Sequence, residues 1–278
     1  MNGKPVFKPS FPAKMDLSVG KPTKHTLNPI LKSSAKSTLL PAATAPLQKM
    51  PVSLQGYGLD ADAARARLVS KLEAQGIEDK RVLNAMRSVL RHKFVDTALS
   101  NQAYEDTSLP IGWGQTISKP NVVARMIELL FEGKTGPLGR VLEIGTGCGY
   151  QAAVLSHIAQ EVYSIERVAG LYDKARENFR PFRIKNTHLL FGDGILGFPK
   201  GAPYFGIIAA AGGDAIPQAW IDQLAVGGRI VAPVSNAANS ASGVSNAQSL
   251  VVVDKTMTGL KRTVLELVQF VPLKSGVT

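Results

Sequence analysis

Short apolar runs that alternate with helical patterns, from Arg140 to Val234, restrict the fold of this 278-residue chain more than any other feature. Three expected strands alternate with two expected helices, at 141–144, 152–158, 162–166, 169–179 and 189–191. Such a pattern is typical of parallel strands joined by crossover helices. A second half follows, with strands expected at 207–211, 228–234, 250–254 and 264–271 and a helix at 217–224. We therefore predict a doubly wound, Rossmann-like α/β sheet of about seven strands, with hairpin-like strands at its C-terminal edge.

Helical patterns also precede the sheet. Apolar residues recur at helical spacing from Ala63 to Leu72 and from Val82 to Leu90, and a third helix is expected from Val122 to Leu130. The segment before the third helix, 109–120, is punctuated by glycine and proline, and loops held on a rigid sheet often carry function. We expect N-terminal helices packed on the sheet and a candidate binding loop between them.

The first 59 residues differ from the rest in composition. They hold eight lysines against one acid, Asp16, so seven of the chain's eleven net positive charges lie there, together with eight prolines. Such a segment cannot pack a core, and we predict a disordered extension at 1–59 followed by one domain at 60–278. Its lysines are either a solvated tail or an electrostatic tether to nucleic acid. No apolar stretch in it is long enough for a signal peptide, which favours the cytoplasm.

Composition excludes several other classes of protein. With 45% hydrophobic and 19% charged residues and a mean hydropathy of +0.04, the chain fits neither a membrane protein nor wholesale disorder. The single cysteine, Cys148, cannot form an intramolecular disulfide, and the four histidines are scattered without metal-ligand spacing. We expect no metal, no membrane association and a monomer, with Cys148 as a small packing residue.

A glycine-rich turn, within the sequence VLEIGTGCGY, directly follows the first strand, where open α/β sheets bind their ligands. Gly145 and Gly147 allow a ligand to approach the backbone, and Gly149 allows the following helix to pack on the strand. A dinucleotide fingerprint requires glycine where this chain has Tyr150. Glu143 repels a pyrophosphate but suits the sulfonium and ammonium groups of S-adenosylmethionine. The turn therefore favours this methyl donor.

Two further acids stand at the ends of the next strands. Glu166 lies about 20 residues on, where an acid accepts hydrogen bonds from ribose hydroxyls. Asp193, followed by Gly194, is placed to accept from the adenine amino group. We assign all three acids and Gly194 to the donor site. Each acid also has a structural alternative: a buried strand-end carboxylate for Glu143, a helix N-terminal acid for Glu166 and a turn former for Asp193.

Three segments carry a resemblance to a known family: PIGWGQTIS from Pro110, VLEIGTGCGY from Val141, and VQFVPL ending at Leu273. From about Ala66 to Leu273 the chain resembles the protein-L-isoaspartate O-methyltransferases. The resemblance implies a class I methyltransferase fold with S-adenosylmethionine as co-substrate. It also implies methylation of the α-carboxyl of L-isoaspartyl residues in damaged proteins and peptides, which initiates repair through a succinimide.

The same resemblance places Gln115, Thr116 and Ile117 at the substrate and assigns Ser118 as the catalytic residue. A carboxylate substrate has an unperturbed pKa near 4, so it is already the nucleophile at neutral pH and needs positioning rather than a base. Hydroxyl groups such as those of Ser118 and Thr116 can donate the hydrogen bonds that hold it. The alternative for Ser118 is a helix N-cap, with Pro120 at the first helical position.

Some positions depart from the family's pattern, and two rival functions stay open. Phe205 follows Tyr204 where an aspartate is common, Gly212 and Gly213 replace other small or proline residues, and Leu90 stands where a proline is usual. One rival is a methyltransferase for RNA or a small molecule, although this chain has AAAGG at 209–213 and lacks the Asn/Asp-Pro-Pro-aromatic motif used on exocyclic amines. The other is a catalytically silent module that binds S-adenosylmethionine.

Overall fold

The computed structural model describes residues 56–136, 138–235 and 248–278. The predicted disorder of 1–59 falls almost wholly outside these ranges, as does the polar Ser/Asn/Ala stretch at 235–248 between the last expected strands. The first helix begins at Gly56, four residues before the domain start expected at Asp60.

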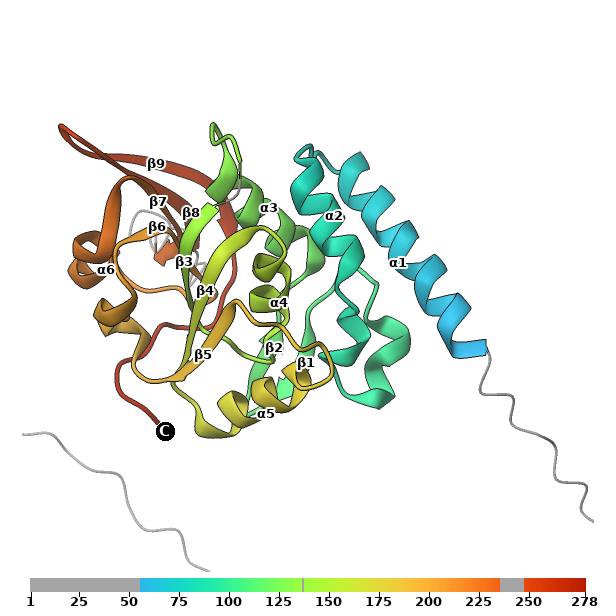
Figure 1. Ribbon diagram of the computed structural model, residues 1–278. Coiled ribbons are helices and arrows are strands. Elements are labelled where there is room, and N and C mark those ends of the chain that lie inside the picture. Colours follow the sequence, from blue (N-terminus) through green and yellow to red (C-terminus); the bar gives the residue numbers. More distant parts are fainter. Residues whose placement is uncertain (1–55, 137, 236–247) are drawn as a thin grey trace, which may run out of the picture. The chain divides into compact units, whose positions relative to one another are not determined.

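A seven-stranded sheet with the strand order β5-β4-β3-β6-β7-β8-β9 forms the centre of the described structure (Figure 1). The first five strands in this order are parallel, whereas β8 and β9 pair antiparallel at one edge. The predicted doubly wound sheet with a C-terminal antiparallel edge is confirmed. Its strands are β3 (Leu138–Ile144), β4 (Ala159–Glu166), β5 (Thr187–Phe191), β6 (Tyr204–Ala209), β7 (Leu224–Ser235), β8 (Gln248–Thr256) and β9 (Gly259–Val268).

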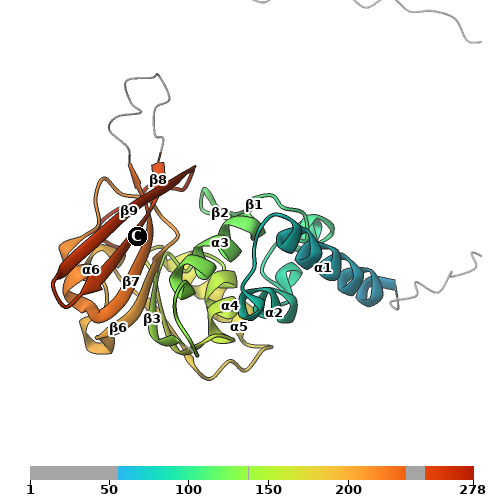
Figure 2. The ribbon, with the colours of Figure 1, turned by 90° about the horizontal axis from the view of Figure 1, so that it is seen from above.

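Helices cover both faces of the sheet (Figure 2). Successive residues of one strand enter different cores: Val141 packs among residues of the five N-terminal helices, and Leu142 packs with Trp220 of the last helix on the opposite face. Both faces are therefore buried, as a parallel sheet requires. The helices are α1 (Gly56–Ala74), α2 (Lys80–Ser88), α3 (Pro120–Phe131), α4 (Tyr150–Ser156), α5 (Ala169–Phe179) and α6 (Gln218–Gln223).

Local sequence accounts for where two of the helices begin. The Asp79 carboxylate accepts a hydrogen bond of 2.8 Å from the Arg81 N–H and caps α2, whose apolar residues face the core. Pro120 occupies the first turn of α3, where its missing N–H and fixed φ cost nothing. No helix among the described residues is long and apolar enough to cross a membrane.

Two elements differ from the sequence expectation. The segment expected as a loop contains an antiparallel hairpin, β1 (Leu109–Gly112) and β2 (Gln115–Ile117), which stands outside the main sheet. Strand β9 begins at Gly259 rather than Val264, because it is an edge strand whose first residues are exposed and therefore show no apolar pattern. The hairpin brings a short rigid element to the edge of the sheet where the site lies.

Candidate active site

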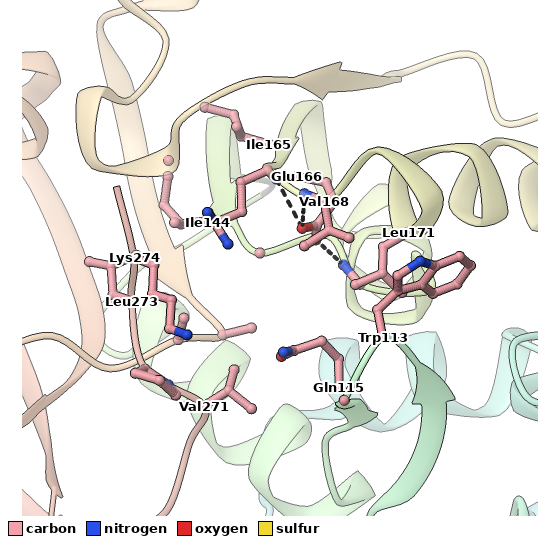
Figure 3. Close-up of a pocket in the computed structure, with 18 of the residues that line it drawn as sticks. Trp113, Gln115, Ile144, Ile165, Glu166, Val168, Leu171, Val271, Leu273 and Lys274 are labelled. Atoms are coloured by element: carbon pink, nitrogen blue, oxygen red, sulfur yellow. Dashed lines mark hydrogen bonds between the residues drawn. The ribbon is translucent and has the colours of Figure 1, made fainter. Parts of the chain in front are cut away.

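A cavity of about 530 Å³ lies at the carboxyl ends of the parallel strands, where ligands of open α/β sheets bind (Figure 3). Its walls come from the β1–β2 hairpin, the glycine turn after β3, the junction of β4 and α5, the segments after β5 and β6, and the C-terminal segment 271–278. Gln115 and Thr116 thus share one cavity with Glu166 and Gly194, although they are far apart in sequence.

The glycine turn has the backbone that the sequence predicts. Gly145 and Gly147 line the cavity with φ of +89° and +56°, values that residues other than glycine rarely adopt. Gly149, with φ of +91°, lies behind the cavity wall. A Cβ on Gly149 would lie 2.7 Å from the Phe179 ring of α5. The expectation that Gly149 lets α4 pack on its strand is therefore corrected, because the close neighbour is α5.

Glu166 lines the cavity and is held there by three backbone amides. Its carboxylate accepts hydrogen bonds from the N–H groups of Gly147 (2.8 Å), Arg167 (2.9 Å) and Val168 (2.9 Å). The last two amides precede α5, so the helix N-terminal role is real. A carboxylate has about four acceptor positions, and three are used, so Glu166 keeps capacity to accept from a ligand hydroxyl.

Asp193 lies outside the cavity lining, although its neighbour Gly194 belongs to it. One carboxylate oxygen caps a short 3-10 helix through the Ile195 N–H, at 2.9 Å. The other accepts the Gly276 N–H at 2.6 Å, which ties the end of β5 to the C-terminal segment. In the described structure Asp193 is thus a turn former and an anchor for a wall of the cavity.

The C-terminal segment is a part of the site that the sequence did not reveal. The Arg167 guanidinium donates to the Gly276 carbonyl at 2.8 Å, and the Thr278 N–H donates to the Arg167 carbonyl at 2.9 Å. The Ala169 N–H, at the start of α5, donates to Thr278 at 2.8 Å. These bonds hold residues 276–278 against the end of β4. The last five residues of the chain, KSGVT, show no periodic pattern that could have predicted this placement.

Glu143 is fully buried and does not line the cavity. The Ser164 hydroxyl donates to one of its oxygens, while the other has no hydrogen-bond partner in the described chain. Burial raises the pKa of Glu143 to about 8, so the group is mostly protonated at pH 7. An anionic Glu143 facing the donor's cationic end, as the sequence suggested, is therefore not what this geometry provides.

A second, small cavity of about 40 Å³ adjoins the glycine turn and contains the predicted catalytic residue. Thr116 lines both cavities, whereas Ser118 and the buried Ile117 line only the small one. The N-cap of α3 is Lys119, without a side-chain hydrogen bond, so the capping alternative for Ser118 is wrong. Within the described residues the Ser118 hydroxyl has no partner and is free to donate.

Arg91 holds this part of the chain and was missed by the sequence reasoning. Its guanidinium is fully buried and donates to the Ser118 carbonyl at 2.8 Å and the Ala103 carbonyl at 2.8 Å. It also lies 4.6 Å from the centre of the Tyr150 ring, a cation–π contact. Arg91 therefore connects the backbone of Ser118 to the helix that follows the glycine turn.

The structure shows the surroundings of two residues that depart from the family's pattern, Phe205 and Gly212. Phe205 lies away from both cavities, with the Lys134 ammonium 5.0 Å above its ring. Gly212 exchanges backbone hydrogen bonds with Val271 (2.9 Å) and Leu273 (2.7 Å), and a Cβ there would collide with the Gln248 side chain. Glycine at 212 thus lets the C-terminal segment approach the cavity.

Other candidate reactive groups have structural surroundings. Burial raises the pKa of the Cys148 thiol to about 11, so it is protonated at neutral pH and packs as a small apolar group. His92 lies 2.7 Å from the Tyr104 hydroxyl, and burial lowers its pKa. Across the described ranges, no group of three His, Cys, Asp or Glu side chains is arranged to hold a metal ion.

Comparison with known proteins decides the family. Residues 63–278 match the sequence profile of protein-L-isoaspartate(D-aspartate) O-methyltransferase. The chain belongs to this family. A relative from Methylibium petroleiphilum, named protein-L-isoaspartate O-methyltransferase, is 59% identical over 223 residues, which cover 80% of this chain and 81% of the relative. One of the same name from Leptothrix cholodnii is 58% identical over 228 residues, 81% and 78% of the two chains.

Solved structures agree with this membership. A protein-L-isoaspartate O-methyltransferase superposes with a TM-score of 0.67 at 28% identity, covering 77% of this chain and 67% of that one. A putative one from Plasmodium falciparum, solved in complex with S-adenosyl-L-homocysteine, has the same fold, with a TM-score of 0.63 at 24% identity and coverage of 76% and 98%. The resemblance seen in the motifs is confirmed, and a methyltransferase of the RNA or small-molecule kind is disfavoured.

Proposed function

We propose that the chain transfers the methyl group of S-adenosylmethionine to the α-carboxyl of L-isoaspartyl residues in peptides and damaged proteins, at the place where the large and the small cavity described above share lining residues. The proposal depends mainly on the position of Thr116, which lines both cavities. Thr116 thereby connects the large cavity at the glycine turn with the small cavity that contains Ser118. The methyl ester then closes to a succinimide: the following backbone nitrogen attacks the ester carbonyl and methanol leaves. Hydrolysis of this ring regenerates aspartate in part of the molecules.

The larger cavity fits the donor. Gly145, Gly147 and Gly194 form part of its walls and, having no side chains, leave room for a ligand beside the backbone. A Cβ on Gly194 would lie 2.5 Å from the Ile144 side chain. Glu166 supplies the acceptor for a ribose hydroxyl. We assign these four residues to direct donor contact, and Gly149, Asp193 and Glu143 to its support from behind. When bound, the donor supplies an electrophilic methyl group on a sulfonium.

The chain's own residues then have to position the substrate. An isoaspartyl carboxylate is ionised at neutral pH, so no proton needs to be removed before it attacks. The free hydroxyl of Ser118 and that of Thr116 donate hydrogen bonds to one carboxylate oxygen and leave the other in line with the donor. Gln115, whose amide points into the cavity (Figure 3), and Ile117 complete the substrate side. Apolar walls at Ile111 and Leu171 exclude water and strengthen these interactions.

Partners and location belong to the same proposal. We expect isoaspartyl proteins and peptides as substrates, a monomer in the cytoplasm, and no membrane partner. All residues that line the two cavities lie at position 111 or beyond, which supports an active unit at 60–278 without the lysine-rich segment 1–59. We expect any binding of nucleic acid to be restricted to that segment.

Paired peptides test the function directly. The protein is incubated with S-adenosylmethionine labelled in its methyl group and with two peptides that differ only in an isoaspartyl or aspartyl linkage. We expect label in the isoaspartyl peptide, released as methanol in mild base because the product is an ester. Equal labelling of both peptides, or label that base does not release, contradicts the proposal, and labelling of RNA supports the rival.

A further inference from the structure

The tip of the β1–β2 hairpin has an unusual backbone. Gly112, Trp113 and Gly114 all have positive φ, of +97°, +50° and +68°. The two glycines adopt these values without steric cost, and a Cβ on either would meet no atom within 4 Å. An aromatic residue in the left-handed region is a genuine outlier, and such outliers cluster at functional sites. A contact of the indole must offset this cost.

That contact is made with Gly170, the second residue of α5. A Cβ built on Gly170 would lie closer than 3.0 Å to three atoms of the Trp113 indole. Gly170 has no positive φ, so its backbone conformation does not require glycine, and glycine weakens a helix relative to alanine. The hairpin and the helix therefore each carry an unfavourable local feature, and both features meet at one contact.

The Trp113–Gly170 contact contributes little to the core but borders the cavity. Trp113 remains 58% exposed, so ordinary burial does not explain it. Trp113 itself lines the cavity, as do its neighbour Gln115 and Leu171 of α5 (Figure 3). A second tether runs beside it, because the Lys174 ammonium of α5 donates to the Ile111 carbonyl at 2.8 Å. The hairpin is thus held to the helix that begins three residues after Glu166.

We propose that Trp113 is a positioning residue for the methyl donor: its indole, seated on Gly170, holds the β1–β2 hairpin closed over the donor cavity and keeps Gln115 and Thr116 in place. This inference rests on the proposed function for the identity of the donor. Retention of the donor depends on the seat as much as on the indole, since a side chain on Gly170 displaces the indole as effectively as its removal does.

A double-mutant cycle tests this dependence. We expect Trp113→Ala and Gly170→Ala each to weaken binding of S-adenosylmethionine about tenfold, measured by calorimetry, and the double variant to be weakened about tenfold rather than a hundredfold. Trp113→Phe, which keeps an aromatic ring on the seat, restores most of the affinity. Gly139→Ala is the control, because its Cβ would lie at an ordinary 3.5 Å from Phe205, away from the cavity.

Fluorescence gives a readout that general destabilisation does not move. The chain has two tryptophans, and the second, Trp220, is 1% exposed in the core. Binding of S-adenosylhomocysteine should shift the emission to shorter wavelength, since a filled cavity removes water from the indole of Trp113. The shift should be absent in Trp113→Phe and strongly reduced in Gly170→Ala, while the melting temperature without ligand hardly changes.

Two affinity results would overturn the role of Trp113: wild-type donor affinity in both single variants, or a double variant in which the two losses multiply. An unchanged emission shift in Gly170→Ala also contradicts it. The proposed function is tested separately by peptide methylation in the wild type. If the wild type binds the donor but methylates no isoaspartyl peptide, the proposed function is contradicted, and the role of Trp113 is still decided by the affinities of the variants. If the wild type does not bind the donor, both the function and the role of Trp113 are contradicted.

Discussion

Ser118 offers the sharpest test at the scale of single residues. Because its hydroxyl caps no helix and has no partner among the residues described, Ser118→Ala should leave the melting temperature unchanged. Single-turnover methyl transfer should fall on the order of a hundredfold, as misplacement of the attacking group does. Ser88→Ala, which removes an exposed hydroxyl on α2, is the matched control. A wild-type rate in Ser118→Ala removes the catalytic assignment.

Glu143 gives a prediction about pH. Its pKa is raised to about 8 in the folded chain, so between about pH 4.5 and 8 the unfolded chain binds fewer protons at this group than the folded one. Stability is therefore lost as the pH rises through this window. Glu143→Gln should lose that dependence, and its free energy of unfolding relative to wild type should rise from pH 5 to pH 8. Denaturant titrations at both pH values measure the difference; parallel curves contradict the raised pKa.

Individual site residues were predictable only where the local backbone decides their position. The positive φ values at Gly145 and Gly147 and the cavity-facing Glu166 follow from a strand that runs into a glycine turn. The partner of Asp193 is Gly276, 83 positions away, and nothing near Asp193 in sequence announces it. Arg91 was equally invisible, because a buried arginine paired only with carbonyl groups and a ring leaves no charge pattern.

At the scale of elements, buried segments were predictable and exposed ones were not. Strands β3, β4 and β6 are buried on both faces toward their C-terminal ends, and their short apolar runs predicted them. The sequence predicted a loop instead of the β1–β2 hairpin because its two strands have only four and three residues and few buried side chains. The first residues of β9 are exposed at the edge of the sheet. Exposed residues need not be apolar, so no apolar pattern marks the start of this strand.

The C-terminal segment carries the prediction at this scale. A chain that ends at Lys274 loses the lining residue Thr278 and the hydrogen bonds of Gly276 to Asp193 and Arg167, which anchor this wall of the cavity, so donor affinity should fall roughly five- to tenfold, about 1 kcal/mol. Asp193→Ala should have a similar effect for the same reason, and combining both changes should add little. Val277→Ala, an exposed side chain outside the cavity lining, is the control. Fully additive losses would show that Asp193 contacts the donor itself.

For the whole molecule, the distribution of charge separates chemistry from recruitment. Seven of the eleven net positive charges lie in residues 1–59, whereas both cavities are built entirely from residues 111–278. A chain that starts at Gly56 should therefore methylate a short isoaspartyl peptide at the rate of the full chain, at low and at physiological salt. Any effect of the lysines should be limited to large polyanionic partners and should vanish as salt screens them.

Two measurements decide this last expectation. Peptide methylation by the shortened chain, with its melting temperature as a check on folding, tests whether the segment contributes to the site, and a folded but inactive shortened chain contradicts the expectation. Binding to a labelled RNA is compared for the full chain, the shortened chain and a full chain whose eight lysines in 1–59 are glutamines. If only the full chain with its lysines binds, and binding falls steeply with salt, the segment is an electrostatic tether. Equal and weak binding by all three makes it a solvated tail.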